Sequence, residues 1–168
     1  DSTISISHGH DIVYSSRSLP PDKIKKIEYE IIFAGYGIFS EDENYNSYEN
    51  LDVKNKVVLV LSGTPKVKGK EILSDEAVKK YSRSSTAKVE LAKSNGAVGL
   101  LILPSEQTLK YWTFFKRYGK SKSYKLEEEF NPELIGNNIP IVLLNEESSI
   151  SLLKDEIQDY HAIVADTL

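Results

Sequence analysis

The strongest constraint on the fold is an uninterrupted run of apolar, mostly β-branched residues, Val57–Leu61. Such a run is typical of a strand that is buried on both faces, as in a parallel sheet covered by helices. Asn55, shortly before it, can adopt the left-handed backbone conformation that a tight turn requires. Ile31–Phe33 predicts an earlier strand, which ends at the glycine pair Gly35 and Gly37. The sequence therefore predicts two strands joined by a long connection.

A helix and a further buried strand follow this run. Ser85 or Thr86 is placed to cap a helix over residues 86–95, and Gly96 ends it where a left-handed residue is favoured. The next apolar run covers residues 97–103. A strand, a helix and a strand in this order predict a crossover unit with a locally parallel sheet, and shorter apolar segments elsewhere indicate that the sheet is mixed. The predicted core of the sheet consists of Val58, Leu59, Val60, Leu101 and Ile102.

Shorter elements are predicted on both sides of the crossover unit. Residues 66–70 are expected to be a basic loop, and residues 75–81 a short helix. After a strand over residues 139–144, Asn145 is placed to cap a last helix. Helical spacing assigns its buried face to Ile150, Leu153 and Ile157, and an apolar segment at residues 162–165 predicts a closing strand.

The chain length and a pair of prolines predict how the chain is divided into domains. At 168 residues the chain fits one domain. Pro20 and Pro21 break the chain after short candidate strands at residues 3–7 and 12–14, so we expect an approach segment at residues 1–29 and a domain at residues 30–168. Because the chain begins at Asp1 and contains no methionine, we also expect a processed or excised piece of a longer protein.

Composition excludes several classes of function. A net charge of −4 argues against nucleic-acid binding, and the absence of cysteine excludes disulfides and thiolate chemistry. No apolar run approaches the roughly 20 residues that span a bilayer, so no membrane partner is expected. The glycines do not have dinucleotide-binding or P-loop spacing, so no cofactor is expected.

Metal-dependent chemistry lacks its ligands in this sequence. The three histidines are His8, His10 and His161, and none begins a His-x-Asp triplet. The acidic stretch at residues 40–52 starts like a calcium loop, but Ser47 and Val53 stand where an EF-hand requires glycine and glutamate. We therefore predict no catalytic residue and no metal ligand, with His8 and His10 in a solvated turn.

Residues 110–125 are unusual, because they combine six basic residues and six aromatic residues with no acidic one. This stretch holds the only tryptophan, and basic residues interleaved with aromatic ones can bind peptides or anionic surfaces. The alternative is that the aromatic side chains cover part of the core while Glu127, Glu128 and Glu129 neutralise the basic charge. Both interpretations remain open from the sequence.

The chain carries a series of motifs: Gly35-Tyr36-Gly37-Ile38, then Tyr45-x-x-Tyr48 with the run Asp52 to Val60, then a helix at 87–96 that leads into a strand at 97–102. Their order resembles the protease-associated (PA) domain, in the form inserted in secreted zinc aminopeptidases related to glutamate carboxypeptidase and the transferrin receptor. The resemblance implies an α/β fold of the swivelling β/β/α type, with mixed sheets and flanking helices. It also implies a non-catalytic role beside a catalytic domain.

The resemblance sets the expected partners. They are the catalytic peptidase domain of the same chain and its peptide or protein substrate, in a secreted or periplasmic, bacterial enzyme. Trp112, Phe115 and Arg117 are the candidate contact residues. Two alternatives remain: a stand-alone peptide-binding receptor module, and a phosphohistidine-type enzyme domain, whose fold is related but whose histidine surroundings His8 and His10 lack.

Overall fold

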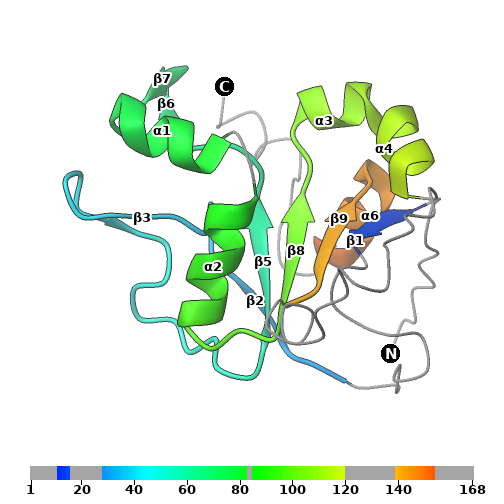
Figure 1. Ribbon diagram of the computed structural model, residues 1–168, viewed down its shortest axis with the longest axis horizontal. Helices are drawn as coiled ribbons and strands as arrows, with labels where there is room; N and C mark the ends of the chain where they lie inside the picture. The colour runs from blue at the N-terminus through cyan, green and yellow to red at the C-terminus, as the bar shows by residue number, and fades with distance from the viewer. Residues whose placement is uncertain (1–10, 16–27, 83–84, 120–138, 154–168) are drawn as a thin grey trace, which may run out of the picture.

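The computed structural model describes residues 11–15, 28–82, 85–119 and 139–153, which form an α/β domain (Figure 1). The strands are β1 (Ile12–Ser15), β2 (Ile31–Phe33), β3 (Phe39–Ser40), β4 (Tyr45–Asn46), β5 (Val57–Leu61), β6 (Lys66–Val67), β7 (Lys70–Glu71), β8 (Gly99–Leu103) and β9 (Ile141–Leu144), and the helices are α1 (Asp75–Ser82), α2 (Thr86–Ser94), α3 (Glu106–Lys110), α4 (Trp112–Gly119) and α6 (Glu146–Leu153).

A five-stranded sheet with the order β1-β9-β8-β5-β2 organises the domain. β2, β5, β8 and β9 run parallel, and β1 pairs antiparallel with β9 at one edge. The predicted crossover from β5 through α2 to β8 is confirmed, as is the mixed character of the sheet. Asn55 adopts the expected left-handed conformation, with φ of 61°.

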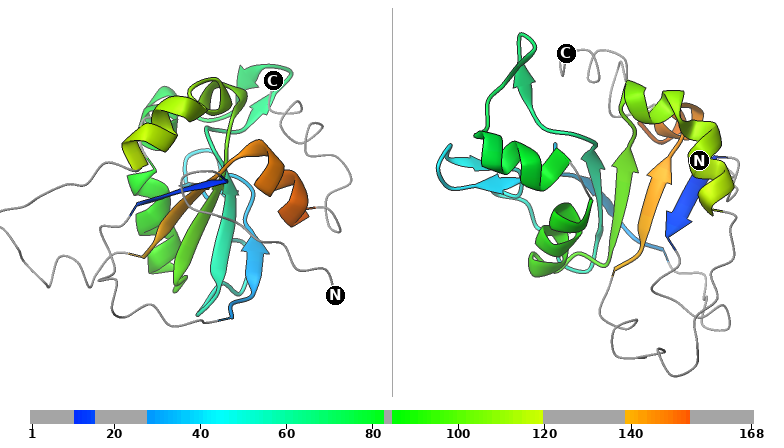
Figure 2. Two further views of the ribbon diagram at one scale, coloured as in Figure 1. Left: turned by 90° about the vertical axis from the view of Figure 1, so that its right-hand side faces the viewer. Right: turned by 45° about the horizontal axis from the view of Figure 1, so that its top comes forward.

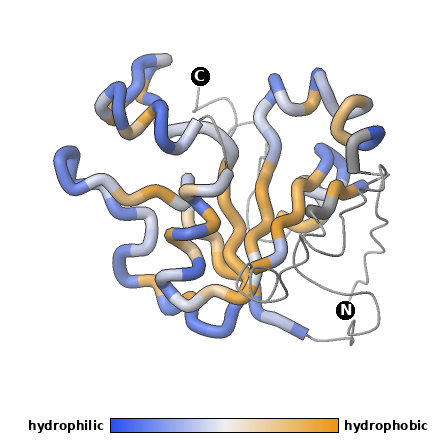
Figure 3. The backbone as a smooth tube through the Cα atoms, in the orientation of Figure 1, coloured by the Kyte–Doolittle hydropathy of each residue, from blue (hydrophilic) through white to orange (hydrophobic). Residues whose placement is uncertain are grey.

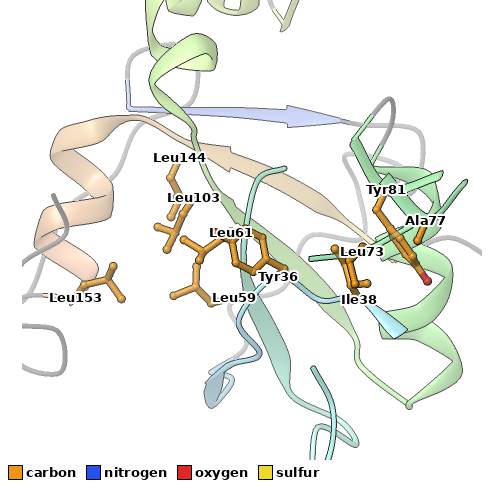
Figure 4. Packing of buried hydrophobic residues seen from close by; sticks show 10 residues of the cluster. All are labelled: Tyr36, Ile38, Leu59, Leu61, Leu73, Ala77, Tyr81, Leu103, Leu144 and Leu153. Carbon is orange, nitrogen blue, oxygen red and sulfur yellow. The ribbon is translucent and has the colours of Figure 1, made fainter. Parts of the chain in front are cut away.

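Helices cover both faces of the sheet, and α2 and α6 lie on opposite sides of it (Figure 2). The hydrophobic strands form the centre of the molecule (Figure 3). On the α2 side, Val58, Val60 and Leu100 pack with Val89 and Ala92 of the helix. The cluster on the other side extends to α1 (Figure 4). Its buried members are Tyr36, Ile38, Leu59, Leu61, Leu73, Ala77, Tyr81, Leu103, Leu144 and Leu153.

Two excursions leave the carboxyl ends of the central parallel strands and lie at the top of Figure 1. The hairpin β6–β7 and α1 follow β5, and α3 and α4 follow β8. The expected basic loop at residues 66–70 is instead part of this hairpin, because Lys68 and Gly69 both have positive φ and close a tight turn. The predicted short helix is confirmed as α1.

The prediction for the end of α2 is confirmed, and the prediction for its start is not. Gly96 has φ of +87° and ends the helix as expected. Ser85 does not cap it, because its backbone is already helical (φ −70°, ψ −8°) and its hydroxyl makes no capping hydrogen bond. A side-chain cap needs an extended residue, so the prediction was wrong for Ser85, and Thr86, the alternative, is the first residue of the helix itself.

The buried face of α6 also differs from the prediction. Asn145 caps the helix, because its Oδ1 accepts a hydrogen bond from the Ser148 amide at 2.7 Å. However, Ile150 is exposed, and Ser148, Ser149 and Leu153 are the buried residues. The backbone amide of Asn145 and the Ser148 hydroxyl both donate hydrogen bonds to the backbone oxygen of Asp11. These two bonds fix the rotation of the helix.

Three further predictions concern Leu101, the first strand and the two ends of the chain. Leu101, expected to be buried, is only partly buried, and it packs against the cluster that contains Leu103 and Leu144. β1, expected in an approach segment, is hydrogen-bonded to the main sheet, and the boundary at residue 30 stays a prediction. The candidate strands at 3–7 and 162–165, and Ile157, lie outside the described residues.

Candidate functional site

The segment that the sequence singled out forms two short helices after β8. Ser105 caps α3, since its hydroxyl oxygen accepts a hydrogen bond from the Thr108 amide at 3.2 Å. Tyr111 separates the two helices, and α4 packs against β1 at the edge of the sheet. The aromatic residues are therefore presented by helices, and the described part of the segment is no irregular loop.

The three candidate contact residues do not share one face of α4. Trp112 and Phe115, three positions apart, are both partly buried, whereas Arg117 is exposed. The Phe115 ring also makes an edge contact with Phe114, at a centroid distance of 5.9 Å. Partial burial favours a packing role for Trp112 and Phe115, so Arg117 is the candidate whose side chain faces solvent. Contact with a partner stays a prediction for all three.

Two exposed aromatic residues belong to the predicted segment but were not among its candidate contact residues. Tyr111 is 59% exposed and Phe114 is 60% exposed, one helical turn apart. Lys110 and Arg117 are exposed beside them. We call these four residues the α4 outer face, although it begins at the end of α3: Lys110, Tyr111, Phe114 and Arg117. The signal in the sequence was their i, i+3 spacing, which complements the spacing of Trp112 and Phe115.

The α4 outer face is suited to binding and has no catalytic arrangement. Large apolar side chains exposed next to cations stack on aromatic or planar groups and pair with carboxylates. Tyrosine and arginine are among the residue types enriched at interface hot spots. Within the described residues, no group of three or more His, Cys, Asp or Glu side chains is placed to hold a metal ion.

A second unusual residue, Lys88, lies inside the molecule. It is only 2% exposed, and its Nζ donates hydrogen bonds to the backbone oxygens of Leu61 at 2.8 Å and Gly63 at 2.7 Å. The Nζ also lies 5.7 Å from the centre of the Tyr36 ring. Lys88 therefore ties α2 to the loops that leave β5 and β2.

Burial lowers the pKa of the Lys88 ammonium to about 7. A desolvated lysine with a lowered pKa is a possible nucleophile in enzymes. Here the amine is enclosed by the protein and occupied by two carbonyl acceptors. Its position supports a structural role. The sequence analysis missed it, although Lys88 precedes the buried Ala92 by four residues on the helix.

The acidic stretch after β3 forms a packed lobe against α1. Glu43 accepts hydrogen bonds from the Ser40 hydroxyl and, at 2.8 Å, from the Ser74 amide, and these bonds lower its pKa. Tyr48 is buried; burial, with a smaller contribution from Tyr81, raises its pKa to about 12. Tyr48 is thus a neutral packing residue, and Tyr45 is partly buried against the core cluster that contains Tyr36 and Ile38.

The histidines considered for metal or phosphate chemistry, His8, His10 and His161, lie outside the described residues. Among the described helices, none is long and apolar enough to cross a membrane.

Comparison with known proteins adds one finding to this geometry. The model of the PA domain family matches residues 27–152, which include every described element after β1 except the last residue of α6. No curated protein matches the sequence.

Proposed function

We propose, starting from the fact that this chain belongs to the PA domain family, that it is an accessory domain of a larger secreted or periplasmic zinc peptidase. PA domains are protease-associated domains that are generally accessory and non-catalytic. The host that the motifs favour is an aminopeptidase of the group related to glutamate carboxypeptidase and the transferrin receptor. In this role the domain shapes substrate access or holds a protein partner.

The single observation that carries the contact role is the α4 outer face. Phe114 and Tyr111 are the most exposed large hydrophobic side chains among the described residues, and both lie on this basic surface. Large aromatic residues exposed together on an otherwise acidic chain are typical of an interaction site.

In this proposal one face of α4 packs within the domain and the other contacts a partner. The inner face, with the partly buried Trp112 and Phe115, has the packing role, and α4 as a whole packs against β1 at the sheet edge. The outer face, with Tyr111, Phe114 and Arg117, contacts the catalytic domain or its peptide substrate. Arg117 supplies a fixed positive charge for a carboxylate, and the aromatic rings supply apolar area at low cost in conformational entropy.

The non-catalytic role is tested on the chain of 168 residues alone. After dialysis it should contain far less than one zinc ion per chain, and it should not hydrolyse a panel of aminoacyl anilides. Zinc close to one per chain together with measurable turnover would contradict the proposal.

The host is tested on the gene that encodes the chain. A His-x-Asp zinc motif in the sequence flanking this domain is the expected result. A gene product without such a motif would instead favour the stand-alone peptide-binding receptor module.

A further inference from the structure

Among the described residues, β2 is an edge strand with one unpaired side. It pairs with β5 through Glu30, whose oxygen accepts from the Val57 amide, and through Ala34, whose amide donates to the Leu59 oxygen, both at 3.0 Å. Because the backbone groups of a strand point alternately to its two sides, the N–H and C=O groups of Ile31 and Phe33 point away from β5. No strand in the described part of the chain pairs with this side.

The side chains of this edge are divided by chemistry. Tyr29, Ile31 and Phe33 alternate along the chain and are 47%, 40% and 37% exposed, so they form an apolar row on one face. Glu28 and Glu30 occupy the alternate positions and are also exposed. Glu30 lies 3.1 Å from Lys56, yet its side chain keeps 62% of its surface in solvent.

The other edge of the sheet is covered, because α4 packs against the edge strand β1. Edge strands are usually protected by lysine, proline or a covering element, because their free backbone groups attract other strands. The β2 residues Ile31, Ile32 and Phe33 include none of these protecting residue types.

From this edge we infer that β2 binds an extended peptide by strand addition, with apolar residues beside Ile31 and Phe33 and with lysine or arginine beside Glu28 and Glu30. Peptides added to a sheet edge gain affinity from main-chain hydrogen bonds and specificity from alternate side chains. Cross-strand pairs of opposite charge and of apolar residues supply that specificity here. The inference deepens the accessory role by naming its peptide class, and it does not depend on the zinc peptidase host.

The probe is an acetylated and amidated peptide in which lysine and valine alternate. Amide hydrogen exchange followed by NMR should slow at Ile31 and Phe33 when the peptide binds. Exchange at Ile32, whose amide faces β5, should not change. A peptide of the same composition with all lysines before all valines should bind at least about tenfold more weakly, because it loses several cross-strand pairs.

The matched variants are Ile31→Pro and Ile31→Val. Proline removes an N–H that faces away from β5, so it should abolish binding and leave the β2–β5 ladder in place, while valine should bind as the wild type. Thermal unfolding checks that both variants are folded. If Ile31→Pro does not fold, N-methylated peptides replace it. Methylation of the valine amides and of the lysine amides should then have unequal effects, because only one set faces β2.

Three binding results would overturn the inference. The Ile31→Pro variant could bind the alternating peptide as tightly as the wild type does, or the peptide could fail to bind the wild type. Methylation of the valine amides and of the lysine amides could also weaken binding equally. Amides of Ile31 and Phe33 that are already protected in the free chain would also overturn it, because its own residues 162–165 or a second copy would then hold the edge. None of these results affects the metal and turnover test, so a failure here is distinguishable from a failure of the accessory role.

Discussion

The junction around Lys88 and the α4 outer face are opposite exceptions to the rule that polar residues are outside and apolar residues inside. At the junction a charged side chain of α2 is buried among backbone oxygens. At the start of α4, Phe114 and Tyr111, the residue that precedes the helix, are exposed. The first exception joins loops inside the domain, and the second leaves a surface available for a partner.

The energetics of the two regions differ accordingly. Burial of an ammonium group is costly unless hydrogen bonds compensate for lost hydration, and Leu61 and Gly63 provide those bonds to Lys88. Exposed rings such as Tyr111 add little to the stability of the folded domain, because they bury little area. The comparison therefore predicts large effects on stability at the junction and small ones on the outer face.

The largest effect is expected for Lys88→Ala. The change leaves a cavity and removes the donor from two backbone oxygens, so the free energy of unfolding should fall by about 2–5 kcal/mol. Denaturant unfolding measures it. Lys93→Ala, at an exposed position of the same helix, is the control and should stay within about 0.5 kcal/mol of wild type. Equal effects of the two changes would show that Lys88 is not a structural tie.

A pH dependence separates the charge of Lys88 from its volume. The pKa is about 7 in the folded protein and about 10.4 in the unfolded chain, so the unfolded chain binds more protons between these values. Stability from this group is therefore complete above about pH 10.4 and is lost as the pH falls to 7. Relative to Lys88→Met, which does not titrate, the wild type should gain stability as the pH rises from 7 toward 10. A constant difference between the two proteins across this range would contradict the lowered pKa.

Two adjacent residues, the exposed Tyr111 and the partly buried Trp112, should differ in their contribution to stability. Trp112→Ala should lower the free energy of unfolding by about 1–3 kcal/mol, because the side chain is partly buried. Tyr111→Ala should change it by no more than about 0.5 kcal/mol. Thermal and denaturant unfolding of both variants test this. Destabilisation by Tyr111→Ala as large as that by Trp112→Ala would mean that the outer face is part of the core.

Local patterns in the sequence were sufficient for much of the fold. Val57–Leu61 is apolar at every position and forms a buried strand, and Gly96 and Asn145 end and begin helices where their own chemistry favours it. These features depend on short-range geometry, which the sequence displays directly. The mixed α/β fold followed from the order in which they occur.

Long-range contacts explain what the sequence could not show. Lys88 stands between Ala87 and Val89 and resembles a solvated helix residue, because its acceptors belong to a distant loop. The rotation of α4 depends on its contact with β1, so the sequence could not show that Tyr111 and Phe114 face solvent. For this reason the sequence analysis named Trp112 and Phe115 as candidate contacts and gave no ground for naming their exposed neighbours, and the contact role of the segment stays a prediction.

The contact role of the α4 outer face is tested most directly in the longer peptidase that we propose as host. The variant combines Phe114→Ala with Arg117→Ala, and the control is Glu90→Ala at an exposed position of α2. Because truncation of an interface hot spot costs more than about 1 kcal/mol, the kcat/KM for a peptide substrate should fall about fivefold or more in the double variant only. The free energy of unfolding of the isolated domain should change by less than about 1 kcal/mol. Unchanged kinetics, or a kinetic loss that only accompanies unfolding of the domain, would contradict the account.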